Sequence, residues 1–136
     1  MIRRLDRWLV TAVIVMVALG INLPHRTAAQ DSGTTTAVIT SPVENEQLFG
    51  LVSVVGSAGH TSSFDSYTLE YNDLSDPNAP WLLVQPSVRQ QVTNDVLGSW
   101  NTNVIPDGVY SLRLRVFLQS GDVGGEFIVT GLRVVN

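Results

Sequence analysis

One short segment of the chain holds the side chains of an acid–base or nucleophilic site. In "GHTSSFD", His60 stands beside Ser62, Ser63 and Asp65, which are the residue types of a serine hydrolase. The members of such a triad come from separate elements that the fold brings together. No Gly-x-Ser-x-Gly turn is present to expose a nucleophile, and a hydrophilic loop accounts for the same letters. We therefore expect a chain that is not an enzyme and has no catalytic residues.

A second segment, "YNDLSDPN", carries oxygen ligands. Asp73, Asp76 and Asn78 are close together in it, and calcium is bound by carboxylate and carbonyl oxygens of this kind. The Asp-x-Asp-x-Asp-Gly spacing of a calcium loop is missing, however, and Asp and Asn are also the residues that make turns. These three residues are weak calcium candidates, no other metal site is expected, and no cofactor is implied.

Three aromatic residues suggest a surface for sugars. Trp81, Trp100 and Tyr71 would form a stacking platform if they faced solvent together. Tyr71 follows the phase of Tyr67 and Leu69, and Trp100 precedes a strand, so both are expected in the core. Trp81 follows a loop and is the most exposed of the three by expectation.

Two arginines and this tryptophan form the possible interaction surface. Arg113 and Arg115 are two residues apart, which places them on one face of a strand, on the side that faces solvent. With Trp81 they would meet an acidic partner or another copy of the chain. The alternative is that each arginine pairs across the sheet with Asp or Glu, which contributes little at a surface.

The beginning of the chain has the three parts of an export signal. "MIRRLDR" is basic, residues 8–23 are apolar and uncharged, and small residues precede Gln30. Cleavage after Ala29 is the preferred reading, and residues 1–29 kept as a membrane anchor are the alternative. The apolar run is shorter than the roughly 20 residues of a spanning helix. In both cases we expect the rest of the chain outside the cytoplasm, either secreted or anchored through residues 8–23.

Charge and composition exclude several classes of protein and of functional site. The chain has 136 residues, no cysteine and a formal net charge of −4. Without its first 29 residues it keeps four arginines against eleven carboxylates, a net charge of −7, and no lysine occurs anywhere. Nucleic-acid binding requires a basic patch, so this class is excluded. The lack of cysteine excludes disulfides, thiol nucleophiles and zinc–thiolate sites.

Strands dominate the remainder. Residues 30–36, "QDSGTTT", are expected to be a flexible linker and residues 37–136 a single domain. Short apolar runs alternate there with turn residues, which is typical of strands. The candidates are "AVIT", "LVSVVGSA", "YTLEY", "WLLVQ", "VLGSWNT" and "GGEFIVTGLRVVN", with "RQQVT" a weaker one. The pattern predicts an all-β antiparallel β-sandwich of about seven strands after an N-terminal hydrophobic signal or anchor helix.

The clearest strand lies in "IPDGVYSLRLRVFL". A Pro-Asp-Gly turn opens it, and side chains then alternate in type. The inward face is predicted to hold Tyr110, Leu112, Leu114 and Val116, opposite the two arginines. Gly131 in the last run predicts a bulge.

Three segments resemble the bacterial immunoglobulin-like and fibronectin type III-like modules of exported proteins. They are "ITSPVENEQLFGLVSVVGSA", "FDSYTLEYN" followed by Trp81, and "VLGSWNTNVIPDGVYSLRLRV". The resemblance implies an immunoglobulin-like sandwich in which Tyr110 is the corner tyrosine, bonded to backbone a few residues upstream. Leu112 then takes the place of the second core cysteine. Such modules have no shared catalytic residues, so the resemblance implies display, spacing or binding.

Together these observations predict a non-enzymatic module, exported or displayed at the surface, that mediates contacts with an unknown protein or with the cell envelope. The alternative is a carbohydrate-binding or calcium-dependent glycan-binding module. The identity of any partner or ligand is not readable from the residues.

Overall fold

The computed structural model describes residues 32–136. The expected signal or anchor, residues 1–29, lies outside the described residues, as do the first residues of the expected linker. Within residues 32–136, no helix is long and apolar enough to cross a membrane.

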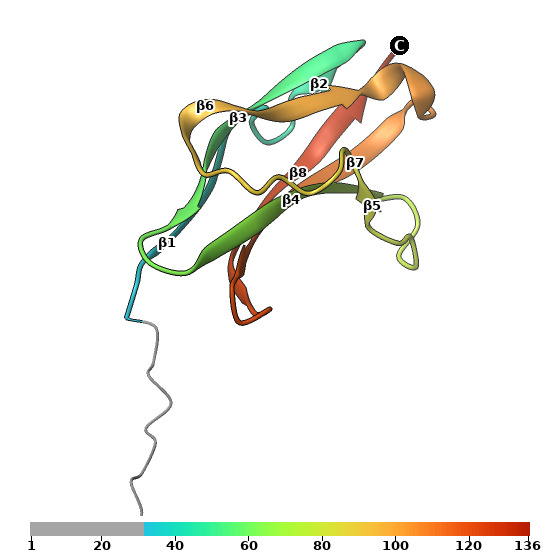
Figure 1. Ribbon diagram of the computed structural model, residues 1–136. Coiled ribbons are helices and arrows are strands. Elements are labelled where there is room, and N and C mark those ends of the chain that lie inside the picture. The colour runs from blue at the N-terminus through green and yellow to red at the C-terminus, as the bar shows by residue number, and fades with distance from the viewer. Residues whose placement is uncertain (1–31) are drawn as a thin grey trace, which may run out of the picture. The chain divides into compact units, whose positions relative to one another are not determined.

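The described part of the chain is all-β and contains two sheets (Figure 1). The three-stranded sheet has the order β1-β3-β6 and consists of β1 (Thr35–Ser41), β3 (Leu51–His60) and β6 (Val92–Asn101). The five-stranded sheet has the order β2-β8-β7-β4-β5 and consists of β2 (Gln47–Leu48), β8 (Val123–Val134), β7 (Gly108–Leu118), β4 (Phe64–Asp73) and β5 (Leu82–Leu83). Strand pairs are antiparallel except β2 with β8. A 3-10 turn, η1 (Thr102–Val104), leads from β6 toward β7. The all-β prediction is confirmed.

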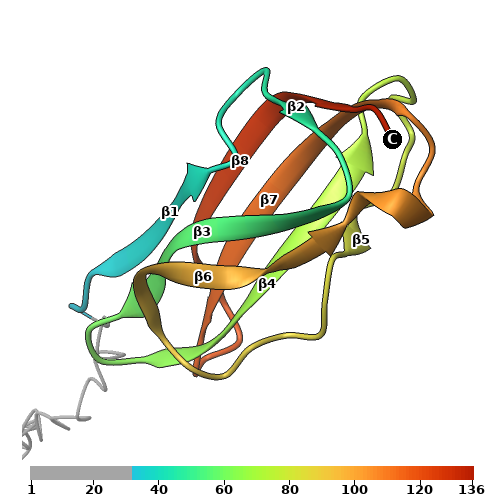
Figure 2. The same ribbon diagram turned by 90° about the horizontal axis from the view of Figure 1, so that it is seen from above.

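The core lies between the sheets, because each sheet turns one apolar face toward the other (Figure 2). The inward face predicted for β7 is confirmed: Tyr110 is 4% exposed, and Leu112, Leu114 and Val116 are fully buried. Burying each of these aliphatic side chains contributes about 1.5–3 kcal/mol. Strand β4 contributes Tyr67 and Leu69 by the same alternation.

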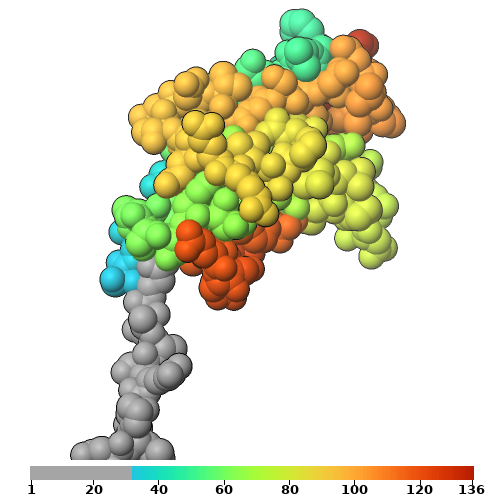
Figure 3. Space-filling model, in the orientation of Figure 1, coloured from blue at the N-terminus to red at the C-terminus, as the bar shows by residue number. Residues whose placement is uncertain are grey.

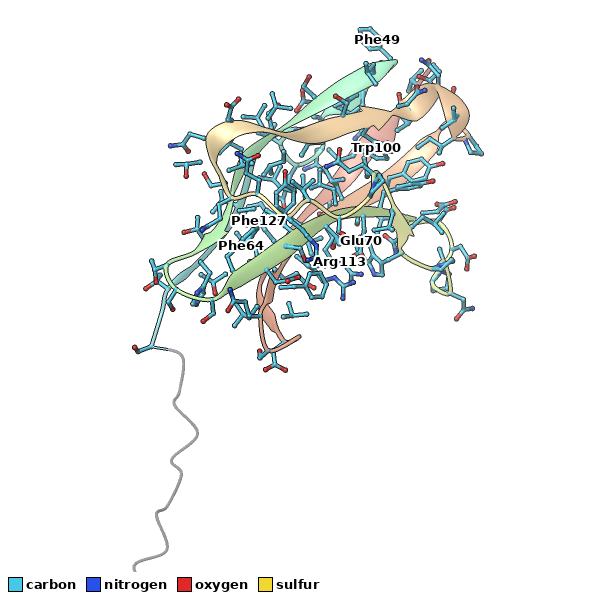
Figure 4. The ribbon with its side chains drawn as sticks, viewed as in Figure 1. Phe49, Phe64, Glu70, Trp100, Arg113 and Phe127 are labelled. Atoms are coloured by element: carbon cyan, nitrogen blue, oxygen red, sulfur yellow. The ribbon has the colours of Figure 1, made fainter. Side chains whose placement is uncertain are left out.

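An aromatic cluster closes one end of the core. The ring centroid of Trp100, which is 2% exposed, lies 5.4 Å from that of Tyr71 and 6.1 Å from that of Tyr110. Figure 4 shows Trp100 between the two sheets. The prediction that Trp100 belongs to the core is therefore confirmed, and Tyr71 packs against the same cluster from a half-buried position.

Strand β8 contains the predicted bulge. Its pairing with β7 shifts by one residue between Leu132 and Val129, and Gly131 there has a φ of +71°. That conformation favours glycine because a Cβ would crowd the backbone. The extra residue lets the inward faces on both sides of the bulge stay buried, as the exposures of Val129 and Leu132 (2% and 0%) show.

Three segments differ from the sequence expectations. "RQQVT" joins "VLGSWNT" in a single strand, β6, which begins only at Val92. "WLLVQ" yields only the two-residue β5, whose leucines are exposed because β5 is the edge of its sheet. Strand β1 begins at Thr35, so the last two residues of the expected 30–36 linker are strand: they pair with β3 at its far end.

The strands run between two distinct ends of the domain. At one end, Thr35 opens β1 opposite His60. At the other end lie the start of β3, where Leu51 pairs with Asn101, and the end of β8, where Val134 pairs with Gly108. Figures 2 and 3 show β1 starting at one end, while the β2–β3 turn and the C-terminus lie at the other.

Candidate functional site

A charged cluster occupies the outer face of the five-stranded sheet. Glu70 of β4 is paired in register with Arg113 of β7, and Arg115 follows two residues later on the same face. Arg113 Nε donates to Glu70 Oε2 at 2.7 Å, and Arg115 Nη2 donates to Glu70 Oε1 at 2.7 Å. One carboxylate therefore binds two guanidinium groups, one on each oxygen. Figure 4 labels Glu70 and Arg113 of this cluster.

The cluster is more covered than the outer face of a sheet usually is. The side chain of Glu70 is 8% exposed, that of Arg113 is 14% exposed and that of Arg115 is 27% exposed. A second carboxylate, Glu126, stands 3.8 Å from Arg113 Nη1 and is 42% exposed. Charges removed from water to this extent need their partners, because an unpaired one keeps its desolvation cost.

Trp81 forms part of this cover. The guanidinium carbon of Arg113 lies 4.0 Å from the centroid of its ring, and that of Arg115 lies 5.1 Å from the ring of Phe117. Trp81, predicted to be the most exposed of the three aromatic residues, is half-buried. The reason is its stacking against Arg113, a residue 32 positions later that sequence reasoning had placed beside it only as a surface neighbour.

Of the two interpretations offered for the arginines, the structure contains the cross-strand pairing. Glu70 is the partner of both, and sequence reasoning noted it only as a polar position of "YTLEY". Its signal was present: an acidic residue in the middle of one strand and two basic residues on the matching face of another.

The imidazole of His60 makes hydrogen bonds to the turn that follows it. His60 ends β3, is 5% exposed, and its Nδ1 accepts hydrogen bonds from the backbone N–H groups of Ser62 at 3.2 Å and Ser63 at 2.8 Å. The imidazole thereby holds the turn between β3 and β4. Asp65 accepts instead from the hydroxyl of Ser66 at 2.8 Å. A cavity of about 250 Å³ opens beside His60, and hydroxyl and amide side chains are prominent among the described residues that line it.

The calcium candidates make turns. Asp73 Oδ1 accepts from both the backbone N–H and the hydroxyl of Ser75, at 2.8 and 2.6 Å. These bonds, the hydroxyl bond foremost, hold the pKa of Asp73 below its usual value. Asp76 Oδ1 accepts from the backbone N–H of Asn78 at 2.9 Å. Across residues 32–136, no group of three or more His, Asp or Glu side chains is placed to hold a metal ion.

The three aromatic residues proposed for sugar stacking do not form one platform. Trp100 lies in the core, Tyr71 packs against it, and Trp81 stacks on Arg113 at the outer face of the sheet. The structure therefore brings together Trp81, Arg113 and Arg115, and it separates Trp81 from the other two aromatics.

Sequence reasoning missed a group of exposed apolar side chains at the end of the domain where β3 begins. We call this group the apolar end; it consists of Phe49, Leu51, Val104 and Val135, which are 73%, 70%, 76% and 48% exposed. Figure 4 shows Phe49 projecting from this end. The available signal was an aromatic residue beside Gly50, which has a φ of +67° and makes the turn.

Hydrogen bonds join the segments that carry the apolar end. Gly50 N–H donates to Asn136 Oδ1 at 3.0 Å, and Thr102 N–H donates to the Gly50 carbonyl at 2.9 Å. Asn136 Nδ2 donates in turn to the Thr102 carbonyl at 2.6 Å. The exposed side chains are therefore carried on tied backbone, although each segment comes from a different part of the chain.

A scan against models of protein families, a search of curated proteins and a search of solved structures gave no match to the chain. What the described residues define is an all-β protein with two packed sheets.

Proposed function

We propose that the chain is a non-enzymatic, exported module of immunoglobulin-like fold that binds another protein through its apolar end. Strand order supports the fold. With the six long strands lettered A, B, C, E, F and G along the chain, one sheet holds A, B and E and the other C, F and G, as in immunoglobulin-type sandwiches. Tyr110, near the start of β7, the strand lettered F, donates its hydroxyl to the Pro106 carbonyl at 2.7 Å, as a corner tyrosine does.

Export is supported by the N-terminal sequence alone, with its arginines, apolar run and small-residue site. The described domain agrees with such a location in one respect. The chain enters it at Thr35, at the end opposite the apolar end. A domain attached through the residues before Thr35 therefore keeps its apolar end away from the point of attachment.

The observation that carries the binding proposal is the exposure of the apolar end. Large apolar side chains that gather on one surface mark sites of association. Phe49, Leu51 and Val104 each expose at least 70% of their surface, and burying such area contributes about 25 cal/mol per Å². The charged cluster offers less, because a partner would have to compete with Glu70 for both arginines.

Site-specific photo-crosslinking in the producing cell tests the proposal. A photoreactive residue at position 49, 51 or 104 should give one discrete adduct with a partner protein. The same residue at position 96 is the control, since Val96 is an equally apolar residue, 50% exposed, on β6. Adducts of equal yield at positions 49 and 96, or none at position 49, would overturn the proposal.

The glycan-binding alternative has less support in the geometry, because its aromatic residues are divided between the core and the outer face. Its calcium-dependent form can be tested separately. If the proposed function holds, millimolar calcium, or its removal by a chelator, should leave the thermal midpoint Tm unchanged, since Asp73 Oδ1 and Asp76 Oδ1 each accept hydrogen bonds within their own turns. A rise in Tm with calcium that disappears in Asp73→Asn would favour the alternative.

A further inference from the structure

A cavity of about 230 Å³ lies beside the apolar end. It is placed between the loop of residues 74–81, which follows β4, and residues 105–106, which precede β7. The rings of Tyr71 and Tyr110 line it, and each of the two loops contributes a proline. Most of the lining is therefore flat and apolar.

The cavity is formed in advance. Its two tyrosine rings meet edge to face, with centroids 6.1 Å apart at 63°. The Tyr110 hydroxyl holds one loop through the Pro106 carbonyl, and Leu74 N–H donates to the Val109 carbonyl at 2.9 Å, which ties the other loop to β7. A ligand would enter without reordering these groups, which favours binding.

The charge at the cavity is negative. Asp73 belongs to the lining, none of the residues 32–136 that line the cavity is basic, and the chain has no lysine. Both turn-forming bonds of Asp73 go to Oδ1, so its Oδ2 is not used by the turn. Burial, followed by the negative charges of Asp73 and Asp107, raises the pKa of Tyr110. The charge of Asp73 therefore acts on the Tyr110 ring, which lines the cavity.

We propose that this cavity, the tyrosine pocket, receives an arginine side chain of the protein that docks on the apolar end. Guanidinium groups stack on aromatic rings and pair with carboxylates, and the pocket offers both. The described domain already contains this combination: Arg113 stacks 4.0 Å from the Trp81 centroid and donates to Glu70, and Arg115 lies 5.1 Å from the Phe117 ring and donates to the same carboxylate. This inference rests on the proposed function, because the apolar end supplies the docking surface.

The surroundings of the pocket favour a protein side chain over a free small molecule. Leu74 on one loop is 46% exposed, and Val104 beside the other is 76% exposed. Leu74 follows the lining residue Asp73, and Val104 precedes the lining residue Ile105, so both side chains would remain in water around a small ligand. A folded partner that presents one arginine would cover them as well.

The experiment uses the full chain in mild detergent, with ¹³C-labelled tyrosine rings. The chain has three tyrosines: Tyr71 and Tyr110 report on the pocket, and Tyr67, 1% exposed in the core, is an internal control. The added probe is N-acetyl-L-arginine methylamide, and its uncharged comparison is the citrulline analogue. We expect the arginine probe to shift the Tyr71 and Tyr110 signals, with about tenfold weaker binding of the citrulline analogue.

A matched pair of variants checks the carboxylate. Asp73→Asn should weaken binding of the arginine probe about fivefold or more. Asp122→Asn should not change it, because Asp122 is bonded to a serine hydroxyl in a turn at the opposite end of the domain. Equal binding of the arginine and citrulline probes, or an unchanged affinity in Asp73→Asn, would overturn the inference.

Two further outcomes separate this inference from the proposed function. Crosslinking at position 49 together with no response to the arginine probe would overturn the pocket and leave the binding proposal standing. A self-associated form of the chain that Asp73→Asn dissociates, with no effect of the arginine probe, would assign the pocket to a second copy and overturn the assignment to a partner protein.

Discussion

The outer face of the five-stranded sheet and the apolar end of the domain use their side chains in opposite ways. On the sheet, Glu70 pairs with both Arg113 and Arg115, and the three side chains are largely covered. At the apolar end, Phe49 and Leu51 expose about three-quarters of their surface and contact little of the chain. The charged residues, whose types suggest a function, are paired with one another within the fold. The side chains of the apolar end, whose types suggest no function, remain exposed and can contact a partner. In this domain, side chains are available for binding because they make few contacts within the fold, not because they are charged.

The largest expected effect comes from removing the centre of the charged cluster. Glu70→Ala leaves two poorly hydrated guanidinium groups without their partner, and we expect a loss of about 3–5 kcal/mol in the free energy of unfolding, measured by urea denaturation. Glu126→Gln is the control. It removes a carboxylate that is 42% exposed and 3.8 Å from its partner, so it should cost less than about 1 kcal/mol.

The same cluster can be removed as a whole. Replacing Glu70 by Leu and both arginines by Met should recover most of the stability lost in Glu70→Ala, because no unpaired charge remains. Equal, small losses in Glu70→Ala and Glu126→Gln would mean that the cluster is an ordinary surface ion pair, and the contrast with the apolar end would disappear.

Two adjacent residues, Leu48 and Phe49, test the description of the apolar end. Leu48→Ala removes a side chain that is 4% exposed and should cost about 2–5 kcal/mol. Phe49→Ala removes a larger side chain that is 73% exposed and should change stability by no more than about 0.5 kcal/mol. Both are measured by the same urea titration. A large loss in Phe49→Ala would place that ring in the packing of the domain and withdraw it from the apolar end.

A smaller effect is expected at Tyr110. Tyr110→Phe removes the hydrogen bond to the Pro106 carbonyl and should cost about 0.5–1.5 kcal/mol in urea denaturation. Tyr67→Phe is a matched control in the core: it removes a bond to the Leu97 carbonyl, which keeps a second donor, Gln85 Nε2. Of the two variants, only Tyr110→Phe should also weaken binding of the arginine probe to the tyrosine pocket.

The smallest expected effect is the contribution of Asp73 to stability, which depends on pH in the acid range. Its lowered pKa means that it contributes stability above the ordinary aspartate range and loses this contribution as the pH falls through its own, lower pKa. The stability difference between the unchanged chain and Asp73→Asn should therefore shrink below about pH 3.8. Ser75→Ala removes the hydroxyl hydrogen bond, which is the main cause of the lowered pKa of Asp73. NMR titration of this variant should therefore show a higher Asp73 pKa than in the unchanged chain. An unchanged pKa would contradict the assignment of the shift to Ser75.

Sequence reasoning succeeded where the decisive pattern is local. The alternation from Tyr110 to Val116 determines which side chains face inward, because a strand has a period of two, and Gly131 marks a backbone conformation that glycine favours. It failed where the outcome depends on distant segments. Arg113 meets Glu70 across 43 positions of the sequence, and nothing around Trp81 indicates that an arginine would cover it. The exposure of Phe49 depends on where both sheets end.

The placement of the first and last described strands has a mechanical consequence. β1 begins at one end of the domain, and β8 finishes at the other, each held by antiparallel neighbours. A pulling force applied through these strands would run along them, across hydrogen bonds that lie perpendicular to the strands. The β1–β3 bonds would then be loaded together in shear, so the domain should resist extension better than one whose strands peel away bond by bond.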